Sequence, residues 1–410
     1  MSEALPKRPG PKPKPKLKRS DVQGAKFLGP ILQLLAPLHD HRADPKRNLH
    51  YDEFCVWLLL YFFTPILDSM RGLQQASDIP ELRQQLKLPR FSLGSFSESA
   101  GVFDPELLVP IMESIGAKLR DIEPDARLLA LDKRLVAADG TLLPALPKMV
   151  WALWCDEEHR AAKLHLQFDL LKGAPESATL THGQASEKKE LRKKLRSGRL
   201  YVTDRGYFGF ELLAAILEAG SSFVARVPNN LVYGIVEERP VSAADAKAGI
   251  HADRIVRVGR SADNPVKQHL RLVEIHTLDS GPSARSRKDS KTKSVYTRDA
   301  SDHTFLLLTD QRDLDANMIS LLYRQRWQVE LFFRWFKKAL EADHLLSLSE
   351  NGLTLIMYCA LIASMLVTLW TGRKPTKRTF EMLCFYLTGW ASEETLLAHI
   401  AKLPPLKKTN

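Results

Sequence analysis

Cysteine is scarce in this chain of 410 residues. The four cysteines are Cys55, Cys155, Cys359 and Cys384, and no two of them have the spacing of a metal-binding motif. A cysteine-based zinc site and a disulfide framework are therefore not indicated. This cysteine usage fits a reducing cytoplasm, which is the compartment that we expect for the protein.

Long hydrophobic runs are also few. Residues 1–20 have no apolar core, so they do not have the pattern of a secretory signal. The run Cys55–Leu67 is too short to span a bilayer. The run Leu353–Trp370 is borderline in length but carries hydroxyl side chains, and we expect it to be a buried helix. Membrane contact through this run is the alternative, and the prediction is a protein without a membrane partner.

Positive charge, by contrast, is abundant. Lysine and arginine number 59 against 48 acidic residues, which gives a net charge of +11 and a pI near 9.4. Such an excess indicates a polyanionic partner, most commonly nucleic acid, with an anionic membrane surface as the rival. With 44% hydrophobic and 26% charged residues, a chain of this length is expected to fold into two or three globular domains.

The N-terminal part of the chain has no strand-like pattern. Residues 1–19 interleave proline with lysine and arginine, which predicts a basic, disordered and extended arm. Residues 20–125 show short helical patterns separated by turn signals. Together with the positive charge, these patterns predict a helical DNA-binding domain over residues 20–125.

Strand-like patterns begin after this region and predict a mixed α/β sheet. Apolar runs of strand length occupy residues 134–140, 149–155, 163–171, 199–206 and 221–227. Two helices are expected between the later runs: a basic one at 186–198, with Ser186 as its cap, and an apolar one that ends near Gly220. The region 228–312 is again β-rich, with candidate strands at 232–238, 254–259, 269–278, 294–299 and 303–310.

Two of the early strand runs carry an aspartate at their C-terminal edge. Asp139 is followed by glycine, and Asp204 is followed by Arg-Gly-Tyr. Either aspartate alone has a simple explanation as a strand-ending turn. If the two strands are neighbours, however, the carboxylates face each other at the edge where α/β proteins build their sites. Such oxygen ligands suit a hard cation such as Mg²⁺.

The segment "YRQRWQVELFFRWFKKAL", residues 323–340, is unusually rich in both aromatic and basic side chains. Helical spacing places Leu322, Val329, Phe333, Phe336 and Leu340 in one apolar stripe. The same spacing places Tyr323, Arg326, Glu330 and Lys337 in a second stripe beside it. The simplest interpretation is an amphipathic helix with an Arg326–Glu330 ion pair. The alternative is that Glu330 is a third metal-binding carboxylate.

These motifs together resemble a known family. Tyr323, Arg326, Glu330 and Lys337 have the spacing of the Y-(2)-R-(3)-E-(6)-K signature, and Asp139 and Asp204 precede it in the expected contexts. The chain is therefore similar to DDE transposases of bacterial insertion sequences, in the subgroup that carries this signature.

The resemblance implies a ribonuclease H-like catalytic core over residues 126–227 and 313–345, interrupted by a β-rich insertion at 228–312 and followed by C-terminal helices at 346–410. It implies that Asp139, Asp204 and Glu330 hold two Mg²⁺ ions, with Mn²⁺ as a substitute. Tyr323, Arg326 and Lys337 would contact the phosphates beside the cleaved end.

The expected activity is metal-dependent cleavage at the terminal inverted repeats of an element, followed by joining of the 3′ hydroxyl to target DNA. Because two ends are cut and joined, a homodimer is expected in the active complex. The expected location is the cytoplasm of a bacterium, in association with the nucleoid.

Two further sets of residues are candidates for DNA contact. The first is a crowded basic segment, for which a solvated helix face is the alternative interpretation. Its members are Lys188, Lys189, Arg192, Lys193 and Lys194. The second is Trp327, because related proteins with such an insertion commonly form a DNA hairpin and place a tryptophan in the insertion. Residues 228–312 contain no tryptophan, which puts the hairpin step in doubt. The aromatic candidates that could substitute for it in this region are Tyr233, Tyr296, His303 and Phe305. Trp327 would then support the flipped base, or it simply packs against the insertion.

Two other functions compete with an active transposase. One is a transposase-derived DNA-binding protein without catalytic activity, which the three intact carboxylates argue against. The other is a tyrosine recombinase that uses Tyr323 as its nucleophile. That chemistry requires a covalent protein–DNA intermediate and no metal, so a trapped adduct would support it and magnesium dependence would oppose it.

Overall fold

The structure is a computed structural model of the chain. It describes residues 28–41, 48–64, 67, 69–123, 125–144, 149, 151–152, 161–259, 264–276, 304–339, 346–374 and 376–402. The basic arm predicted at 1–19 and the candidate strand at 294–299 lie outside these residues. The chain forms two compact units, one of residues 1–104 with 378–402 and one of residues 105–377 with 403–410. The sequence-based domain boundaries stay a prediction.

The first unit is helical. Its aromatic residues supply much of its core, because Phe54 contacts both Phe96 and Phe103, and Trp57 meets Phe91 edge to face. Helix α2 is buried along nearly its whole length. The elements are α1 (Gly29–Leu35), η2 (Ala36–Leu38), α2 (Tyr51–Phe63), α3 (Met70–Ser77), α4 (Pro80–Leu86), α5 (Leu93–Val102), α14 (Lys377–Leu387) and α15 (Glu393–Lys402). The short helices predicted for this part of the chain are confirmed.

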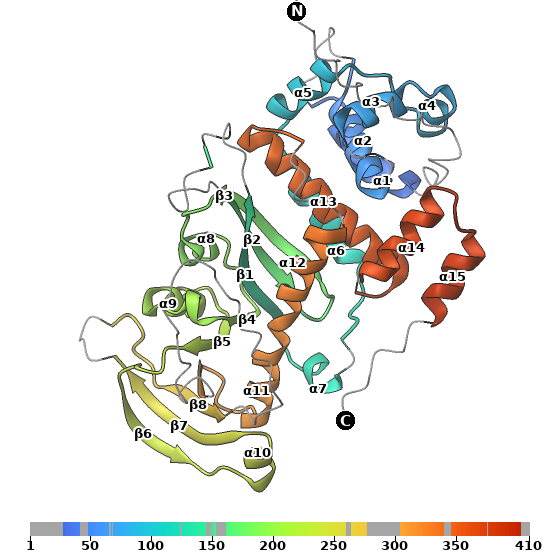
Figure 1. Cartoon of the computed structure of the whole chain (residues 1–410). Coiled ribbons are helices and arrows are strands. Elements are labelled where there is room, and N and C mark those ends of the chain that lie inside the picture. The colour runs from blue at the N-terminus through green and yellow to red at the C-terminus, as the bar shows by residue number, and fades with distance from the viewer. Residues whose placement is uncertain are drawn as a thin grey trace, which may run out of the picture. The chain divides into compact units, whose positions relative to one another are not determined.

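Within the residues that the structure describes, the second unit is built on one mixed sheet of nine strands (Figure 1). The strands are β1 (Arg134–Pro144), β2 (Ala161–Asp169), β3 (Ala174–His182), β4 (Arg199–Thr203), β5 (Ser222–Val227), β6 (Tyr233–Arg239), β7 (Ile250–Val258), β8 (Leu270–His276) and β9 (Thr304–Thr309). Their order across the sheet is β3-β2-β1-β4-β5-β9-β8-β7-β6. Strands β1, β4 and β5 are parallel, and all other pairings are antiparallel. The predicted fold class, a ribonuclease H-like mixed α/β sheet with helices at both ends, is confirmed.

The strands of residues 228–312 extend the core sheet instead of forming a second one. Strand β9 pairs with β5 on one side and with β8 on the other, so β6–β8 continue outward from the core. One buried cluster accordingly joins Tyr201 and Phe223 of the core to Val256 and Leu272 of the outer strands. The β-rich region and the core therefore share a hydrophobic interior.

One predicted strand is wrong and one was missed. In the run 149–155, the described residues Met149, Trp151 and Ala152 lie in irregular or turn structure. Strand β1 instead continues to Pro144 and pairs with β2 along that length. Strand β3 was missed because only one of its faces is buried, so its sequence, APESATLTH, is polar at most positions.

The helices of the second unit flank this sheet (Figure 1). They are η3 (Pro105–Leu108), α6 (Val109–Lys118), α7 (Ala126–Leu129), α8 (Glu187–Lys193), η4 (Arg205–Tyr207), α9 (Phe210–Glu218), α10 (Ala243–Lys247), α11 (Ala316–Gln325), α12 (Trp327–Ala339) and α13 (Glu350–Thr371). By length and composition α13 could cross a membrane, but 83% of its apolar window is buried inside the protein. The buried helix predicted for Leu353–Trp370 is confirmed.

Candidate active site

Asp139 and Asp204 occupy adjacent positions on neighbouring strands. The parallel register of β1 and β4 ends with Ala138 opposite Thr203, and each aspartate is the next residue along its strand. The expectation that the two strands are neighbours is confirmed. The prediction that Asp139 ends its strand is wrong, because β1 runs on to Pro144 in antiparallel pairing with β2. Asp204 does follow the last residue of β4 and lies at the start of η4.

Both aspartates are half-buried and are oriented by backbone N–H groups. Oδ1 of Asp139 accepts a hydrogen bond from the N–H of Gly140, with a nitrogen–oxygen distance of 2.8 Å. Oδ1 of Asp204 accepts one from the N–H of Arg205. These bonds use one oxygen of each carboxylate, and the second oxygen of each carboxylate takes no part in them.

The segment that carries Glu330 is interrupted at Arg326. The sequence predicts one helix over 323–340, whereas α11 ends at Gln325 and α12 begins at Trp327. Arg326 itself keeps helical dihedral angles, so the two helices follow each other closely. The apolar stripe is confirmed, because Leu322, Val329, Phe333 and Phe336 are buried; Leu340 lies outside the described residues. Lys337 fixes α12 to the sheet by donating a 2.6 Å hydrogen bond to the carbonyl oxygen of Leu142 on β1.

Arg326 is the cation at the centre of the site. Its Nη2 lies 2.7 Å from Oε1 of Glu330, which confirms the predicted ion pair. The residue is only 9% exposed, and its Nε has no hydrogen-bond partner among the residues that the structure describes. Its guanidinium carbon lies 5.6 Å from the ring centroid of Tyr323. Burial raises the pKa of the Tyr323 hydroxyl, and the charges of Arg326 and Asp204 also act on it.

The three candidate carboxylates share one electrostatic environment. The pKa of Asp139 is raised to about 6, chiefly by burial and also by the negative charges of Glu330 and Glu187, against the lowering effect of the Gly140 N–H and Arg326. Arg326 interacts electrostatically with Asp204 as well as with Glu330. Carboxylate oxygens suit a hard divalent cation. In the structure, however, Asp139, Asp204 and Glu330 are not found among the described groups whose ligand atoms all lie within 4.8 Å of one another.

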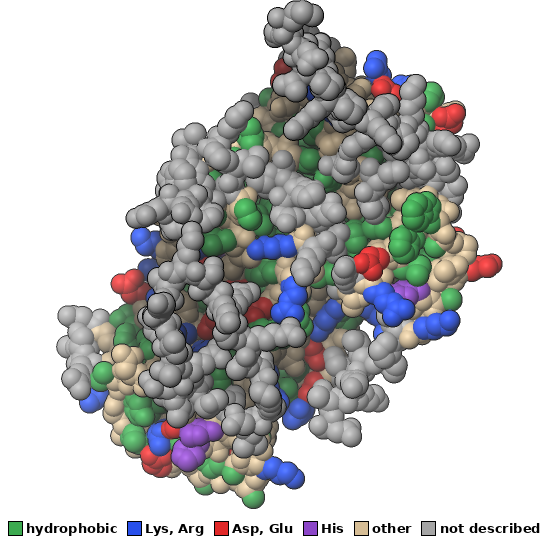
Figure 2. Space-filling view, viewed as in Figure 1, with side chains coloured by type: hydrophobic (Ala, Val, Ile, Leu, Met, Phe, Trp, Pro, Cys, Tyr) green, Lys and Arg blue, Asp and Glu red, His purple; other side chains and the backbone are tan. Residues whose placement is uncertain are grey.

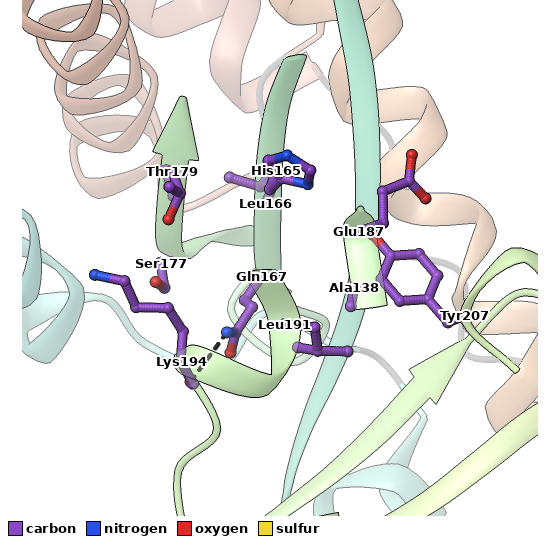
Figure 3. Close-up of a pocket in the computed structure, with 11 residues that line it drawn as sticks. Ala138, His165, Leu166, Gln167, Ser177, Thr179, Glu187, Leu191, Lys194 and Tyr207 are labelled. Carbon is purple, nitrogen blue, oxygen red and sulfur yellow. Dashed lines mark hydrogen bonds between the residues drawn. The ribbon is translucent and has the colours of Figure 1, made fainter. Parts of the chain in front are cut away.

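Glu187 is an acidic residue near the site that the sequence analysis did not single out. Its Oε1 lies 3.0 Å from the position that a Cβ on Gly140 would occupy, so a side chain at residue 140 would press on Glu187. Lys163 is its cationic partner, with Nζ 3.3 Å from Oε1. Glu187 also lines a small pocket with His165 and Tyr207 (Figure 3). An acidic residue in the first turn of α8 has an ordinary explanation in the helix dipole, so the sequence held no signal for this contact.

The basic side chains of α8 and of its C-terminal end are all exposed, as contact with DNA requires. They are Lys188, Lys189, Arg192, Lys193 and Lys194. Two of them face acids, since Lys193 lies 2.6 Å from Glu190 and Arg192 lies 4.0 Å from Glu211. Lys188 approaches the loop after Asp204, with its Nζ 3.8 Å from the position of a Cβ on Gly209. Ser186 occupies the N-cap position of α8, but its side chain makes no capping hydrogen bond.

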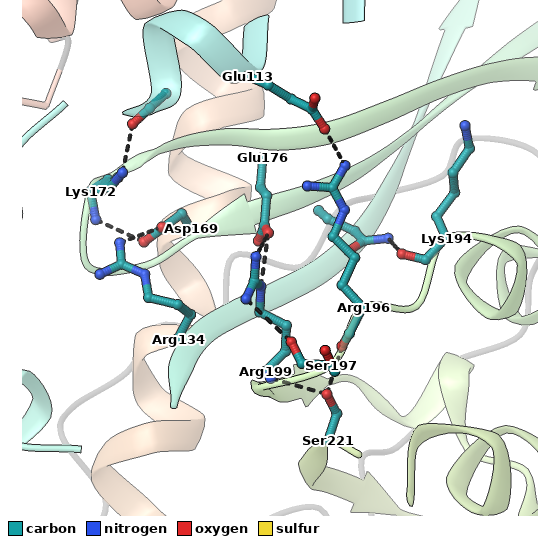
Figure 4. A network of polar contacts seen from close by, with 12 residues as sticks. Glu113, Arg134, Asp169, Lys172, Glu176, Lys194, Arg196, Ser197, Arg199 and Ser221 are labelled. Carbon is teal, nitrogen blue, oxygen red and sulfur yellow. Dashed lines mark hydrogen bonds and ion pairs between the residues drawn. The ribbon is translucent and has the colours of Figure 1, made fainter. Parts of the chain in front are cut away.

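Two arginines that follow α8 in the chain form ion pairs that hold the sheet in place instead. Arg196 pairs with Glu113 at 2.5 Å, and Arg199 pairs with Glu176 at 2.6 Å (Figure 4). The main chain of Arg196 and Arg199 also meets the hydroxyl of Ser221. These contacts fix the start of β4, whose last residue directly precedes Asp204.

Trp327 is 49% exposed and follows Arg326 directly. Tyr233 is half-buried, whereas Phe305 stacks under Arg226, whose guanidinium carbon is 4.2 Å from the ring centroid. The ring of Phe305 lies 6.4 Å from that of Tyr323. The other two aromatic candidates of the β-rich region, Tyr296 and His303, lie outside the described residues. Trp327 is therefore an exposed tryptophan at the start of the helix that carries Glu330.

The raised pKa of Asp139 predicts a measurable effect on stability. The pKa of Asp139 is about 6 in the folded chain against an ordinary 3.8. Its favourable contribution to the free energy of unfolding is therefore fully present below pH 3.8 and is lost as the pH rises through 6. After discounting for partial solvent exposure, the shift corresponds to on the order of 2 kcal/mol. In metal-free protein at pH 8, Asp139→Asn should therefore melt about 5 °C above the unaltered chain.

This difference should shrink as the pH is lowered to 5, where Asp139 becomes protonated. Thermal melts in the presence of EDTA would measure it. Asp132→Asn, at an exposed acid near the other end of β1, is the matched control and should change nothing. Identical melting of Asp139→Asn and the unaltered chain at pH 8 would contradict the electrostatic account.

Comparisons with known proteins give a consistent result. Residues 130–366, more than half of the chain, match the family described as the transposase DDE domain. A putative transposase of Sinorhizobium fredii is 27% identical over 55% of this chain, and the match spans 57% of that relative's length. A probable transposase for insertion sequence element IS5377 of Geobacillus stearothermophilus is 23% identical over 86% of this chain and 85% of its own.

One solved structure is also similar. It is a cryo-EM structure of a piggyBac transposase synaptic complex with hairpin DNA, 12% identical, covering 94% of this chain and 82% of that one. Its TM-score is 0.34, which is too low to support an inference. The assignment to the subgroup with the Y-R-E-K signature stays a prediction.

Proposed function

The chain belongs to the DDE transposase family, and from this premise we propose that it cleaves DNA at the ends of an insertion element and joins the freed 3′ hydroxyl to target DNA. The observation that carries the proposal is the arrangement of three carboxylates. Asp139 and Asp204 each follow the last residue of the parallel pairing between β1 and β4. Arg326 interacts electrostatically with Glu330 and with both aspartates. A mixed sheet with acids directly after the parallel pairing of two adjacent strands is a suitable frame for such chemistry.

The reaction consists of two displacements at phosphorus. Water attacks the phosphodiester at the element end, the P–O3′ bond breaks, and a 3′ hydroxyl is released. This hydroxyl then attacks a phosphodiester of the target, whose own P–O3′ bond breaks to leave a 3′ hydroxyl on the target strand. Asp139, Asp204 and Glu330 would hold the divalent ions, Mg²⁺ or in its place Mn²⁺. When bound, these ions supply Lewis acidity at the reacting phosphate and a more acidic attacking hydroxyl.

The chain's own cations would position the DNA. Arg326 has a buried Nε–H without an acceptor among the described residues, and a buried donor of this kind is costly unless it finds one. A phosphate oxygen beside the cleaved bond would satisfy it. Tyr323 flanks Arg326 with its hydroxyl. Lys337 holds α12 against β1 through Leu142, and we propose that it contacts a phosphate of the bound end.

The partners follow from the same chemistry. We propose that the protein binds double-stranded DNA, both the terminal inverted repeats and the target. A homodimer would hold two ends together, and light scattering of the protein with end DNA would show it as a complex of two chains and two ends. Elution as one chain per end under active conditions would contradict the dimer. Cytoplasmic, nucleoid-associated localisation belongs to the same proposal and would be tested by co-sedimentation with the nucleoid.

The exposed cations of α8 should contribute to DNA affinity without choosing sequence. Each phosphate that is neutralised contributes about 0.9 to the slope of log affinity against log salt. Lys188→Gln combined with Lys189→Gln should therefore flatten that slope by about 2 and weaken cognate and random DNA alike. Fluorescence anisotropy at several salt concentrations would measure the slope.

The matched control is Lys118→Gln combined with Arg120→Gln, which removes two exposed charges after α6. It should leave the slope close to that of the unaltered chain. If both double variants lower the slope equally, the contribution is one of net charge and the α8 surface is not a specific contact.

We further propose that the second strand is cut through a DNA hairpin, with Trp327 supporting the base near the end. Extruding a base requires a few kcal/mol, and stacking on an aromatic ring recovers about 1–3 kcal/mol. Trp327→Ala should keep the first nick and fail to accumulate or resolve hairpins on a denaturing gel. Leu331→Ala, also exposed on α12, is the control. Hairpin formation and resolution at the rate of the unaltered chain would refute the role of Trp327, and the absence of hairpins with that chain would refute the route.

A further inference from the structure

A cluster of two histidines and one glutamate lies on the outer strands of the sheet, separate from the three candidate carboxylates. His251 is on β7, and Glu274 and His276 are on β8. One ligand atom from each residue lies within 4.8 Å of the other two. Figure 2 shows exposed histidine side chains over this part of the molecule. We propose that these three residues form a binding site for a divalent first-row transition metal of the zinc class.

The strand geometry brings the three side chains to one face. Glu274 and His276 are two residues apart on β8, so they point to the same side of the sheet. The register between β7 and β8 shifts between Ile250 and Ala252, which makes His251 the extra residue of a β-bulge. His251 therefore lies between the partners of Ile275 and Glu274, and its ring centroid is 4.5 Å from that of His276.

The bulge is built into the backbone. Gly249, just before it, has φ of +88°, a conformation that favours glycine. Its carbonyl oxygen accepts a 2.8 Å hydrogen bond from the N–H of His276. A Cβ at residue 249 would lie 2.5 Å from the carbonyl oxygen of His276, so no other residue fits without a shift. Glycine at this position therefore holds the two histidine-bearing segments in close contact.

The distances suit a metal with nitrogen and oxygen ligands. Nε2 of His276 lies 3.4 Å from Oε1 of Glu274. Two ligands of a tetrahedral zinc ion, each about 2.0–2.2 Å from the metal, are about 3.4 Å apart. The imidazole rings of His251 and His276 lie 4.5 Å apart, inclined by 30°. Small side-chain rotations would bring the third ligand into place, and a water would complete four-coordination.

Glu274 is already oriented as a metal-binding carboxylate would be. Its Oε2 accepts a 3.0 Å hydrogen bond from Arg254, which leaves Oε1 directed to His276. Arg254 is itself held by Glu238 at 3.0 Å. A second residue that fixes a ligand in this way is a usual feature of metal sites. Two imidazoles and one carboxylate select zinc-class ions over Mg²⁺, which prefers oxygen ligands and retains its waters.

A bound ion would tie the start of β7 to the end of β8. Arg271 on β8 is buried and donates to the carbonyl oxygens of Gln311, Arg312 and Leu314, the segment that leads into α11. The metal would therefore stabilise the strands that support the helix pair carrying Arg326 and Glu330. Its role is structural, and it is independent of the proposed cleavage reaction.

The test is calorimetric titration of the untagged, metal-free protein with ZnCl₂ in the presence of excess Mg²⁺, so that carboxylate sites are already occupied. The unaltered chain should bind one equivalent of Zn²⁺ that is lost in both His251→Ala and His276→Ala. His269→Ala, at another exposed histidine of the same region, is the matched control and should bind like the unaltered chain. Equal Zn²⁺ binding by all four proteins would overturn the proposal.

A second measurement uses only the unaltered chain, so it does not depend on the folding of a variant. Zn²⁺ should protect His251 and His276, but not His269, from carbethoxylation by diethylpyrocarbonate, as read by peptide mass spectrometry. The same rate of modification at all three histidines with and without Zn²⁺ would contradict the site. A histidine–glutamate ion pair without metal affinity would give that result.

Discussion

Asp139→Ala, Asp204→Ala and Glu330→Ala should each abolish cleavage at an element end while leaving end binding largely intact. The loss of any one carboxylate removes a ligand from the proposed metal site. Several kcal/mol of transition-state stabilisation would disappear with it, which is about a thousandfold in rate. Binding should persist, because these substitutions remove none of the cations that we propose contact phosphates.

Cleavage of end-labelled DNA and anisotropy-based binding would be measured on the same preparations. Asp132→Ala supplies the control, because Asp132 is an exposed acid near the start of β1, at the opposite end of the strand from the site. Robust cleavage by any one of the three variants would refute the assignment of that residue. Failure of all three to bind DNA would point to misfolding, which thermal melts would detect.

Arg326→Ala should have the largest effect on the stability of the metal-free protein. Arg326 compensates Glu330 directly and interacts with Asp139 and Asp204, so its removal leaves half-buried carboxylates without a counter-charge. Breaking a buried pair from one side costs about 3 kcal/mol. Mg²⁺ should then raise the melting temperature of this variant more than that of the unaltered chain, because the ion would replace the missing positive charge.

Arg324→Ala is the matched control, since Arg324 is an exposed arginine two residues earlier. Its melting temperature and its response to Mg²⁺ should equal those of the unaltered chain. An identical rise on adding Mg²⁺ in Arg326→Ala and Arg324→Ala would mean that the ion and Arg326 do not act on the same carboxylates. Cleavage by Arg326→Ala is also expected to fall, because the proposed phosphate contact is lost.

Much of the site could be predicted from local patterns. The strand runs around Asp139 and Asp204 are strongly apolar, and parallel pairing then places the two acids together. The burial of Val329 and Phe336 follows from helical spacing. The Arg326–Glu330 pair follows from the same spacing.

Other features depend on contacts between distant segments. Strand β3 carries a polar sequence because one of its faces is exposed, so no apolar run marks it. Strand β9 pairs with both β5 and β8, and these partners cannot be predicted from the sequence of β9 alone. Glu187 approaches Gly140 only after α8 packs beside β1. The bulge that places His251 beside His276 is set by Gly249, whose conformation the sequence alone does not reveal.

We propose that this chain cleaves DNA with metal ions held by Asp139, Asp204 and Glu330. The most direct test is to incubate the purified protein with labelled DNA from the ends of its own element, with Mg²⁺ and with EDTA, and to resolve the products on a denaturing gel. The account predicts a nick that leaves a 3′ hydroxyl at the element end, present with Mg²⁺ and absent with EDTA. Cleavage that persists in EDTA, or a covalent adduct between Tyr323 and DNA, would contradict it.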